Sequence, residues 1–147
     1  MAEEQAEIVT GWNLVELVEI PRISDDGILI FAQTPDHIPF DIRRIYWILG
    51  ADPTLPRGCH AHRETMQLLF CIQGSIQMIV DNGSLREEVI LNRPEQGLLL
   101  RPMVWHEMHG FRSDTVLLGL ASDIFKESDY IRDHEIFIGL LRGNVTT

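Results

Sequence analysis

Pro56-Arg57-Gly58-Cys59-His60-Ala61-His62-Arg63 is the stretch of sequence that most strongly indicates the fold. Two histidines two positions apart on an extended chain point to the same face, because side chains alternate along a strand. Pro56 and Gly58 mark a turn that lets the backbone enter that strand. An apolar run over 68–72 follows and ends at Gln73-Gly74. We therefore expect the histidine pair at the opening of a buried, strand-lined interior.

The rest of the chain divides into many short segments of strand character. Strands are predicted over 12–20, 27–33, 42–49, the histidine segment with its apolar run, 75–80, 85–91, 98–101, 104–109 and 114–121. Asp81-Asn82-Gly83-Ser84 is a hairpin signal, and Ser24 to Gly27 reads as a turn. Residues 1–11 are expected to be frayed, and apolar residues at helical spacing predict one or two short helices within 125–142. This pattern favours an all-β, cupin-type jelly-roll barrel or sandwich with short C-terminal helices.

Size and charge narrow the class of protein. The 147 residues, 45% of them hydrophobic, predict a single domain over 1–147. No run reaches the roughly 18 apolar residues of a membrane span, and the acidic N-terminus lacks the order of a signal peptide. We expect a cytoplasmic protein without a membrane partner. A net charge of −10 argues against nucleic acid as a partner, although a few local arginines suffice for a nucleotide diphosphate.

A metal centre is one alternative for the histidines. Cupins commonly bind a metal through His-x-His, a nearby Glu and a later His, and His60, His62 and His106 could supply three imidazoles. Met66 or Gln67 occupies the usual Glu position, and a thioether is a poor ligand for a hard divalent ion. Three histidines alone can hold zinc, so this alternative stays open. We favour a site with no metal, in which the pair carries out acid–base chemistry.

Several segments together resemble a known family. They are Pro39 to Tyr46, Arg57-Gly58-Cys59-His60-Ala61-His62, Arg101 to Met108, and Ala121-Ser122-Asp123 followed by Asp129-Tyr130-Ile131-Arg132. In these segments, which span roughly 12–141, the chain is similar to the dTDP-4-keto-6-deoxyglucose 3,4-ketoisomerases, within the WxcM-like sugar-nucleotide cupins. The resemblance implies a jelly roll, a homodimer with strand exchange, and a reaction that needs no cofactor. That reaction moves a ketone from C4 to C3 of a dTDP-linked 4-keto-6-deoxy sugar in deoxyamino-sugar biosynthesis.

One position departs from the family. Its members often carry an Asp-x-Arg-Gly-like turn in the first hairpin, where this chain has Asp25-Asp26-Gly27. An acid thus replaces a base beside the expected sugar site. The configuration of the product at C4 is left open by this change.

The expected reaction assigns roles to the candidate residues. A proton must leave C3 and one must return at C4, which requires a base with a pKa near the working pH and donors to the developing oxyanion. His60 and His62 form the proposed proton-transfer pair, with His60 favoured as the carbon base, and Tyr46 is the hydroxyl donor. Predicted substrate-binding residues are Arg44 and Arg57 for the diphosphate, Trp105 or Trp47 for the thymine or sugar, and Gln67 and His106 in the sugar pocket.

Purely structural roles for these residues, and other functions for the protein, compete with this assignment. A tyrosine such as Tyr46 on a strand is more often a core residue, and the acidic group Asp123, Glu127 and Asp129 reads as solvated surface. Three other functions stay open: a 3,5-epimerase-like cupin acting on the same ketosugar, a metal-binding cupin such as a dioxygenase, and a non-catalytic sugar-nucleotide-binding module.

Overall fold

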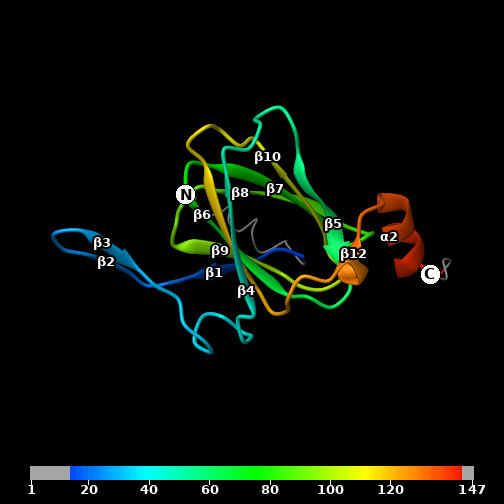
Figure 1. Cartoon of the computed structure of the whole chain (residues 1–147), viewed down its shortest axis with the longest axis horizontal. Helices are drawn as coiled ribbons and strands as arrows, with labels where there is room; N and C mark the ends of the chain where they lie inside the picture. The colour runs from blue at the N-terminus through cyan, green and yellow to red at the C-terminus, as the bar shows by residue number, and fades with distance from the viewer. Residues whose placement is uncertain (1–13, 144–147) are drawn as a thin grey trace.

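Two five-stranded antiparallel sheets make up most of the computed structural model, which describes residues 14–143. The first sheet has the order β1 (Glu16–Glu19), β9 (Gln96–Leu100), β6 (Gln67–Gln73), β11 (Val116–Ala121), β4 (Arg44–Leu49). The second has the order β12 (Tyr130–Ile131), β5 (Arg57–His62), β10 (Trp105–His109), β7 (Ile76–Asp81), β8 (Arg86–Leu91). This arrangement, seen in Figure 1, confirms the predicted all-β sandwich.

The main core lies between the two sheets. Leu69, Leu98 and Leu117 of the first sheet pack with Met78 and Leu91 of the second, and all five are buried. The first sheet is apolar on its other face as well, where Leu68, Phe70 and Leu120 belong to a second buried cluster. In β4 the alternation leaves Tyr46 and Ile48 partly buried. The other face of β4 carries Ile45, Trp47 and Leu49, which are exposed.

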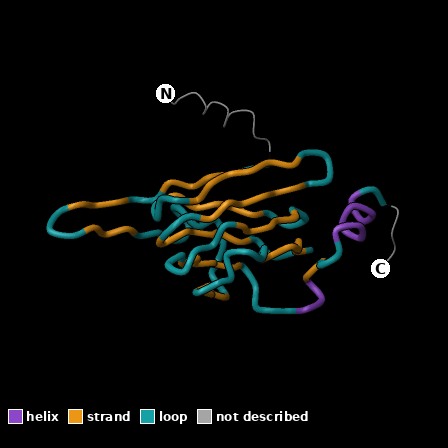
Figure 2. The backbone as a smooth tube through the Cα atoms, turned by 90° about the horizontal axis from the view of Figure 1, so that it is seen from above, coloured by secondary structure: helices purple, strands orange, loops and turns teal. Residues whose placement is uncertain are grey.

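A hairpin projects from the body of the molecule. It consists of β2 (Arg22–Ser24) and β3 (Ile28–Ile30), joined by the predicted turn, and it extends well beyond the sheets (Figures 1 and 2). The sequence indicated a single strand over 12–20 before this turn. The structure instead separates β1 from β2 at Ile20-Pro21, because proline lacks the N–H that would continue the ladder. The predicted frayed segment 1–11 lies outside the described residues.

The C-terminal segment corrects the predicted helical tail. It contains a short 3-10 helix, η1 (Glu127–Asp129), then β12, then α2 (His134–Leu141), whose N-cap Asp133 accepts hydrogen bonds from two backbone N–H groups. Tyr130 and Ile131 are therefore not helical: they pair with His62 and Ala61 of β5. The unpaired edge of β5 supplies backbone partners that the tail's own periodicity does not reveal. No helix within 14–143 is long and apolar enough to cross a membrane.

Candidate active site

A cavity of about 280 Å³ opens between β4 of the first sheet and β5 and β10 of the second. Eight of the nine candidate site residues line it: Arg44, Tyr46, Trp47, Arg57, His60, His62, Gln67 and His106. Tyr130 of β12 contributes to the same wall. The cavity is thus built from strands that lie far apart in the sequence.

A bulge in β5 aims His60. His60 pairs with His106 of β10, but Gly58 pairs with the next residue, Glu107, so Cys59 is an extra residue in the ladder. Gly58 and Cys59 both have positive φ, of 81° and 56°. A Cβ on Gly58 would also meet the His106 ring at 3.2 Å, so glycine suits this position on two grounds. The bulge turns the Gly58 carbonyl toward the His60 Nδ1 atom, 2.9 Å away.

This contact determines the form of His60. A carbonyl oxygen only accepts hydrogen bonds, so Nδ1 carries the proton and Nε2 keeps its lone pair. Burial, together with the neighbouring His62, lowers the pKa of His60 from 6.5 to about 4. His60 is therefore a neutral imidazole at neutral pH. A neutral imidazole with a free Nε2 is the form that can accept a proton.

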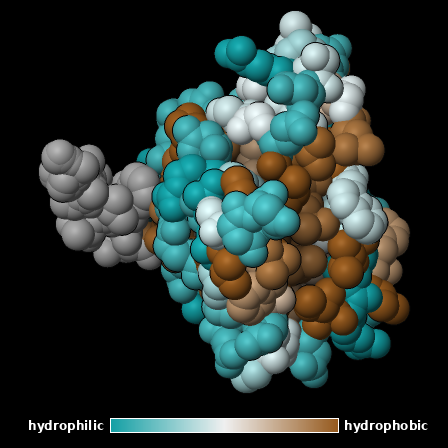
Figure 3. Space-filling model, turned by 90° about the vertical axis from the view of Figure 1, so that its left-hand side faces the viewer, coloured by the Kyte–Doolittle hydropathy of each residue, from teal (hydrophilic) through white to brown (hydrophobic). Residues whose placement is uncertain are grey.

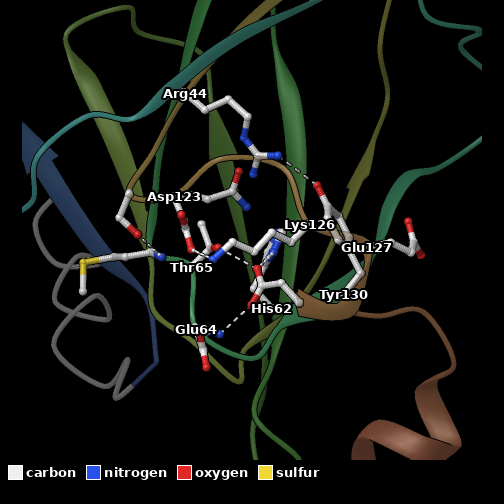
Figure 4. Close-up of polar contacts among 12 residues, drawn as sticks. Arg44, His62, Glu64, Thr65, Asp123, Lys126, Glu127 and Tyr130 are labelled. Atoms are coloured by element: carbon white, nitrogen blue, oxygen red, sulfur yellow. Dashed lines mark hydrogen bonds and ion pairs between the residues drawn. The ribbon is translucent and has the colours of Figure 1, made fainter.

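His62 has a different partner. Its Nδ1 lies 2.8 Å from Oδ2 of Asp129, and both side chains are buried. Burial lowers the pKa of His62, and the Asp129 carboxylate opposes that shift without reversing it. Figure 4 shows His62 beside Glu64 and Thr65, which also contact this carboxylate. The prediction that Asp129 lies on the solvated surface is wrong, because η1 turns this side chain inward onto β5.

The third imidazole completes the cluster. The His106 ring lies 4.6 Å from that of His60 and is stacked at 6.2 Å from that of His62, measured between centroids. Complete burial and the two neighbouring histidines hold the pKa of His106 well below its usual value, so it is neutral. Within 14–143, no group of three or more His, Cys, Asp or Glu is arranged to hold a metal ion.

Tyr46 is held at the base of the cavity wall. Its hydroxyl donates to Oε1 of the buried Gln67 at 2.5 Å, and burial raises its pKa far above the usual value. It therefore stays protonated, and its proton is engaged with Gln67. Gly119 of β11 lies directly opposite Tyr46, and any side chain there would overlap the tyrosine ring.

Tyr130 is the second site residue that the sequence analysis missed. Its ring lies 4.5 Å from that of His62 and 4.8 Å from that of His60, and Arg44 reaches toward its hydroxyl, with Nη1 at 3.5 Å (Figure 4). The guanidinium of Arg132 covers the ring at 4.3 Å. Tyr130 and Asp129 belong to a segment that carried the family resemblance, and this was the signal available for both.

Trp105 is the predicted site residue that the structure places elsewhere. Along β10, His106 faces the cavity, so its neighbours Trp105 and Glu107 face the opposite side. The Trp105 indole packs against Phe137 and His134 of α2, and its Nε1 donates to Glu107 at 3.0 Å. The other predicted tryptophan, Trp47, lines the cavity and is 62% exposed.

Comparison with known proteins relates this site to a family. The model of the family "FdtA: WxcM-like, C-terminal" matches residues 13–142. The TDP-4-oxo-6-deoxy-α-D-glucose-3,4-oxoisomerase of Aneurinibacillus thermoaerophilus is 42% identical over 123 residues, which cover 83% of this chain and 88% of the relative.

Solved structures agree with this assignment. A 3,4-ketoisomerase from Helicobacter canadensis is 37% identical with a TM-score of 0.84, covering 87% of this chain and 97% of that one. A histidine-to-asparagine variant of the 3,4-ketoisomerase QdtA from Thermoanaerobacterium thermosaccharolyticum, in complex with TDP-4-keto-6-deoxyglucose, is 34% identical. Its TM-score is 0.86, and the match covers 92% of this chain and 99% of that one. The sugar epimerase NovW, 13% identical with a TM-score of 0.69, shares the fold alone. The chain therefore belongs to the WxcM-like FdtA family, which confirms the resemblance to sugar-nucleotide 3,4-ketoisomerases found in its sequence.

Proposed function

We propose that this protein is a sugar 3,4-ketoisomerase that converts TDP-4-keto-6-deoxyglucose, or a close TDP-linked analogue, into the 3-keto isomer. The observation that carries the proposal is the His60 imidazole, neutral and with Nε2 free, beside a second histidine in one cavity. The relatives named for this reaction and the complex of one of them with TDP-4-keto-6-deoxyglucose support the substrate class. Such a substrate is consistent with the cytoplasmic location expected from the sequence and with deoxyamino-sugar biosynthesis.

The reaction follows from the two imidazoles. His60 Nε2 removes the proton from C3 of the sugar. The electron pair of the C3–H bond then forms a double bond between C3 and C4, and the C4 ketone oxygen takes up negative charge. His62 moves a proton from the C3 hydroxyl to the C4 oxygen. The protonated His60 then returns its proton to C4 as the carbonyl forms at C3. No atom is gained or lost, and both histidines regain their starting forms.

The cavity walls supply the binding groups. Arg57 is exposed at the cavity, and Arg44 is partly buried with its Nε unpartnered among the described residues, so both can pair with phosphate oxygens. Trp47 offers an exposed aromatic face for the thymine or the sugar. Tyr46 holds the Gln67 side chain in place at the cavity, because its hydroxyl proton is already donated to that side chain. His106 presents a neutral imidazole to the sugar.

The direct test is the product. The protein is incubated with TDP-4-keto-6-deoxyglucose in heavy water, and the product is assigned by NMR. We expect the carbonyl carbon at C3 and a hydroxyl-bearing C4. Unaltered substrate would overturn the proposal, and so would deuterium at C3 and C5 with the ketone retained at C4, which is the result for a 3,5-epimerase.

We also infer that the protein acts as a homodimer through its hairpin. Ile23, Ile28 and Leu29 of the hairpin are about half exposed or more, and an isolated two-stranded hairpin is marginally stable in water. Beside it lies an apolar cavity of about 510 Å³, with Phe70, Ile72, Leu118 and Leu120 of the first sheet in its lining. Figure 3, viewed from the side on which the hairpin projects, shows a broad hydrophobic patch on this face. A partner's hairpin, exchanged as the resemblance implies, would cover it.

A matched pair of variants tests the dimer. Leu29 and Leu55 are 58% and 59% exposed, but Leu55 does not line the apolar cavity. We expect Leu29→Glu to be monomeric and Leu55→Glu to stay dimeric in sedimentation experiments. A monomeric wild type, or an unchanged Leu29→Glu dimer, would contradict the inference.

A further inference from the structure

We propose that Asp129 is a positioning residue for His62: it holds the proton on Nδ1 of that imidazole and so reserves Nε2 for the sugar oxygens. The role of His62 in the reaction rests on the proposed function, whereas the pairing of the two side chains does not. Asp129 comes from the C-terminal segment, 67 residues away from its partner in the sequence. Neither its position nor its acidic neighbours in the sequence indicate this contact.

The carboxylate of Asp129 accepts three hydrogen bonds. Its Oδ1 accepts from the backbone N–H of Glu64 at 2.7 Å, and its Oδ2 accepts from the Thr65 hydroxyl at 2.6 Å and from His62 Nδ1 at 2.8 Å. The backbone N–H of Glu64 can only donate, so Oδ1 must be an acceptor. Burial alone would raise the pKa of Asp129, but these bonds outweigh it and keep the pKa below the usual value. Asp129 is therefore an ionised acceptor, and the proton between it and His62 belongs to Nδ1.

The two catalytic histidines differ in what faces their Nδ1 atoms. His60 meets the neutral carbonyl of Gly58, whereas His62 meets a carboxylate. A carboxylate stabilises an imidazolium far more than a carbonyl does, so His62 can carry a second proton transiently while His60 returns readily to its neutral form. The other charged or titratable groups that face His62 are His60, His106, Arg44, Tyr130 and Arg132, and none of them is a carboxylate. Among the described residues, Asp129 is thus the one carboxylate hydrogen-bonded to either imidazole of the pair, whereas Glu127 acts on His60 only through space.

The fold holds Asp129 rigidly in this place. Its carbonyl accepts from the N–H of Arg63, and the following residues, Tyr130 and Ile131, form the β12 ladder with β5. Ile131 packs with Phe137 and Trp105 in a separate buried cluster that fastens α2 to the second sheet. Trp105, which does not line the cavity, therefore contributes to the site by anchoring the segment that carries Asp129.

The test variant is Asp129→Asn. Asparagine keeps the size of the side chain, but its amide nitrogen must face at least one of the three donors, which favours the other tautomer of His62 or a broken contact. We expect kcat on TDP-4-keto-6-deoxyglucose to fall more than tenfold, with TDP affinity within threefold of wild type and an altered pH profile of kcat. A fall of tenfold or less overturns the proposal, and so does a loss of TDP affinity in parallel with kcat, because that result marks a purely structural role.

Asp81→Asn is the matched control. Asp81 also joins a histidine, accepting from His134 Nε2 at 3.0 Å, and a backbone N–H, that of Gly83 at 2.7 Å, but it lies outside the cavity lining. We expect this variant to lose stability while keeping its kcat. A loss of kcat equal to that of Asp129→Asn would show that any disrupted Asp–His pair has this effect, and the proposal would then be wrong.

A measurement on the wild-type protein settles the pairing without substrate. In ¹⁵N NMR spectra of the histidine side chains at neutral pH, we expect His62 as the Nδ1–H tautomer with a deshielded proton. The Nε2–H tautomer would overturn the proposal even if Asp129→Asn failed to fold. If the wild type shows no turnover, the proposed function fails, whereas this spectrum still decides whether Asp129 positions His62.

Discussion

Replacing Gly119 by alanine is predicted to displace Tyr46 from the wall of the cavity. Gly119 and Tyr46 are directly paired on β11 and β4. A Cβ on Gly119 would lie 2.5 Å from Cε1 of the Tyr46 ring and 2.6 Å from its hydroxyl oxygen. Atoms cannot approach this closely, so the ring must move and its bond to Gln67 must break.

The cost has two parts. Overpacking a tight site typically destabilises by about 1–3 kcal/mol. Losing the Tyr46 donor leaves the buried Oε1 of Gln67 without its partner, which costs about 1–3 kcal/mol more. The sum is about 2–6 kcal/mol, which corresponds to a fall in Tm of roughly 5–20 °C for a chain of this size. Because Tyr46 lines the cavity, KM for the TDP-sugar should rise as well.

The assay compares thermal unfolding of Gly119→Ala with that of Gly27→Ala. A Cβ on Gly27 meets nothing within 4 Å, so this variant should unfold close to the wild-type temperature. Equal Tm values for Gly119→Ala and wild type, together with an unchanged KM, would refute the close packing of Gly119 beneath Tyr46.

Further predictions concern pH and the two tryptophans. Because the folded-state pKa of His60 is about 4, the acid limb of kcat/KM should lie near pH 4, and a limb near pH 6.5 would contradict the assigned environment of His60. Stability to urea should decrease as pH falls from about 6.5 to about 4, because in this range unfolded His60 binds a proton and folded His60 does not. Trp105→Phe should lower Tm and leave TDP affinity unchanged, since Trp105 anchors α2. Trp47→Ala should weaken TDP binding and leave Tm unchanged, and calorimetric titration with TDP distinguishes the two variants.

Local patterns predicted the features that depend on alternation and turn chemistry. A period of two puts Arg44 and Tyr46 on the same face of β4, and both line the cavity. The Pro-Gly turn predicted His60 and His62 on a strand that enters the interior. Trp105 and His106 cannot both face the cavity, because consecutive residues of a strand point to opposite faces. Both were nevertheless predicted as site residues. Residue type alone favours Trp105 as a site residue, whereas the strand period of β10 excludes it from the face that carries His106.

Long-range contacts explain what the sequence analysis missed. Tyr130 and Ile131 match a helical spacing, but two residues are too few for periodicity to distinguish a helix from a strand, and the free edge of β5 decides the outcome. Asp129 reads as a surface acid because its three partners lie 64 to 67 residues earlier in the chain. The bulge at Cys59 depends on the register between β5 and β10, which no local pattern encodes.

The central claim is that His60 carries hydrogen between adjacent carbons of the sugar, and its most direct test is loss of the C3 hydrogen as the ketone moves to C3. The measurement follows TDP-4-keto-6-deoxyglucose by proton NMR in heavy water with wild type and with His60→Asn. We predict that wild type removes the C3 hydrogen and forms the 3-keto isomer, and that His60→Asn does both at least about 100-fold more slowly, with TDP affinity retained. Loss of the C3 hydrogen with His60→Asn at the wild-type rate would contradict the account.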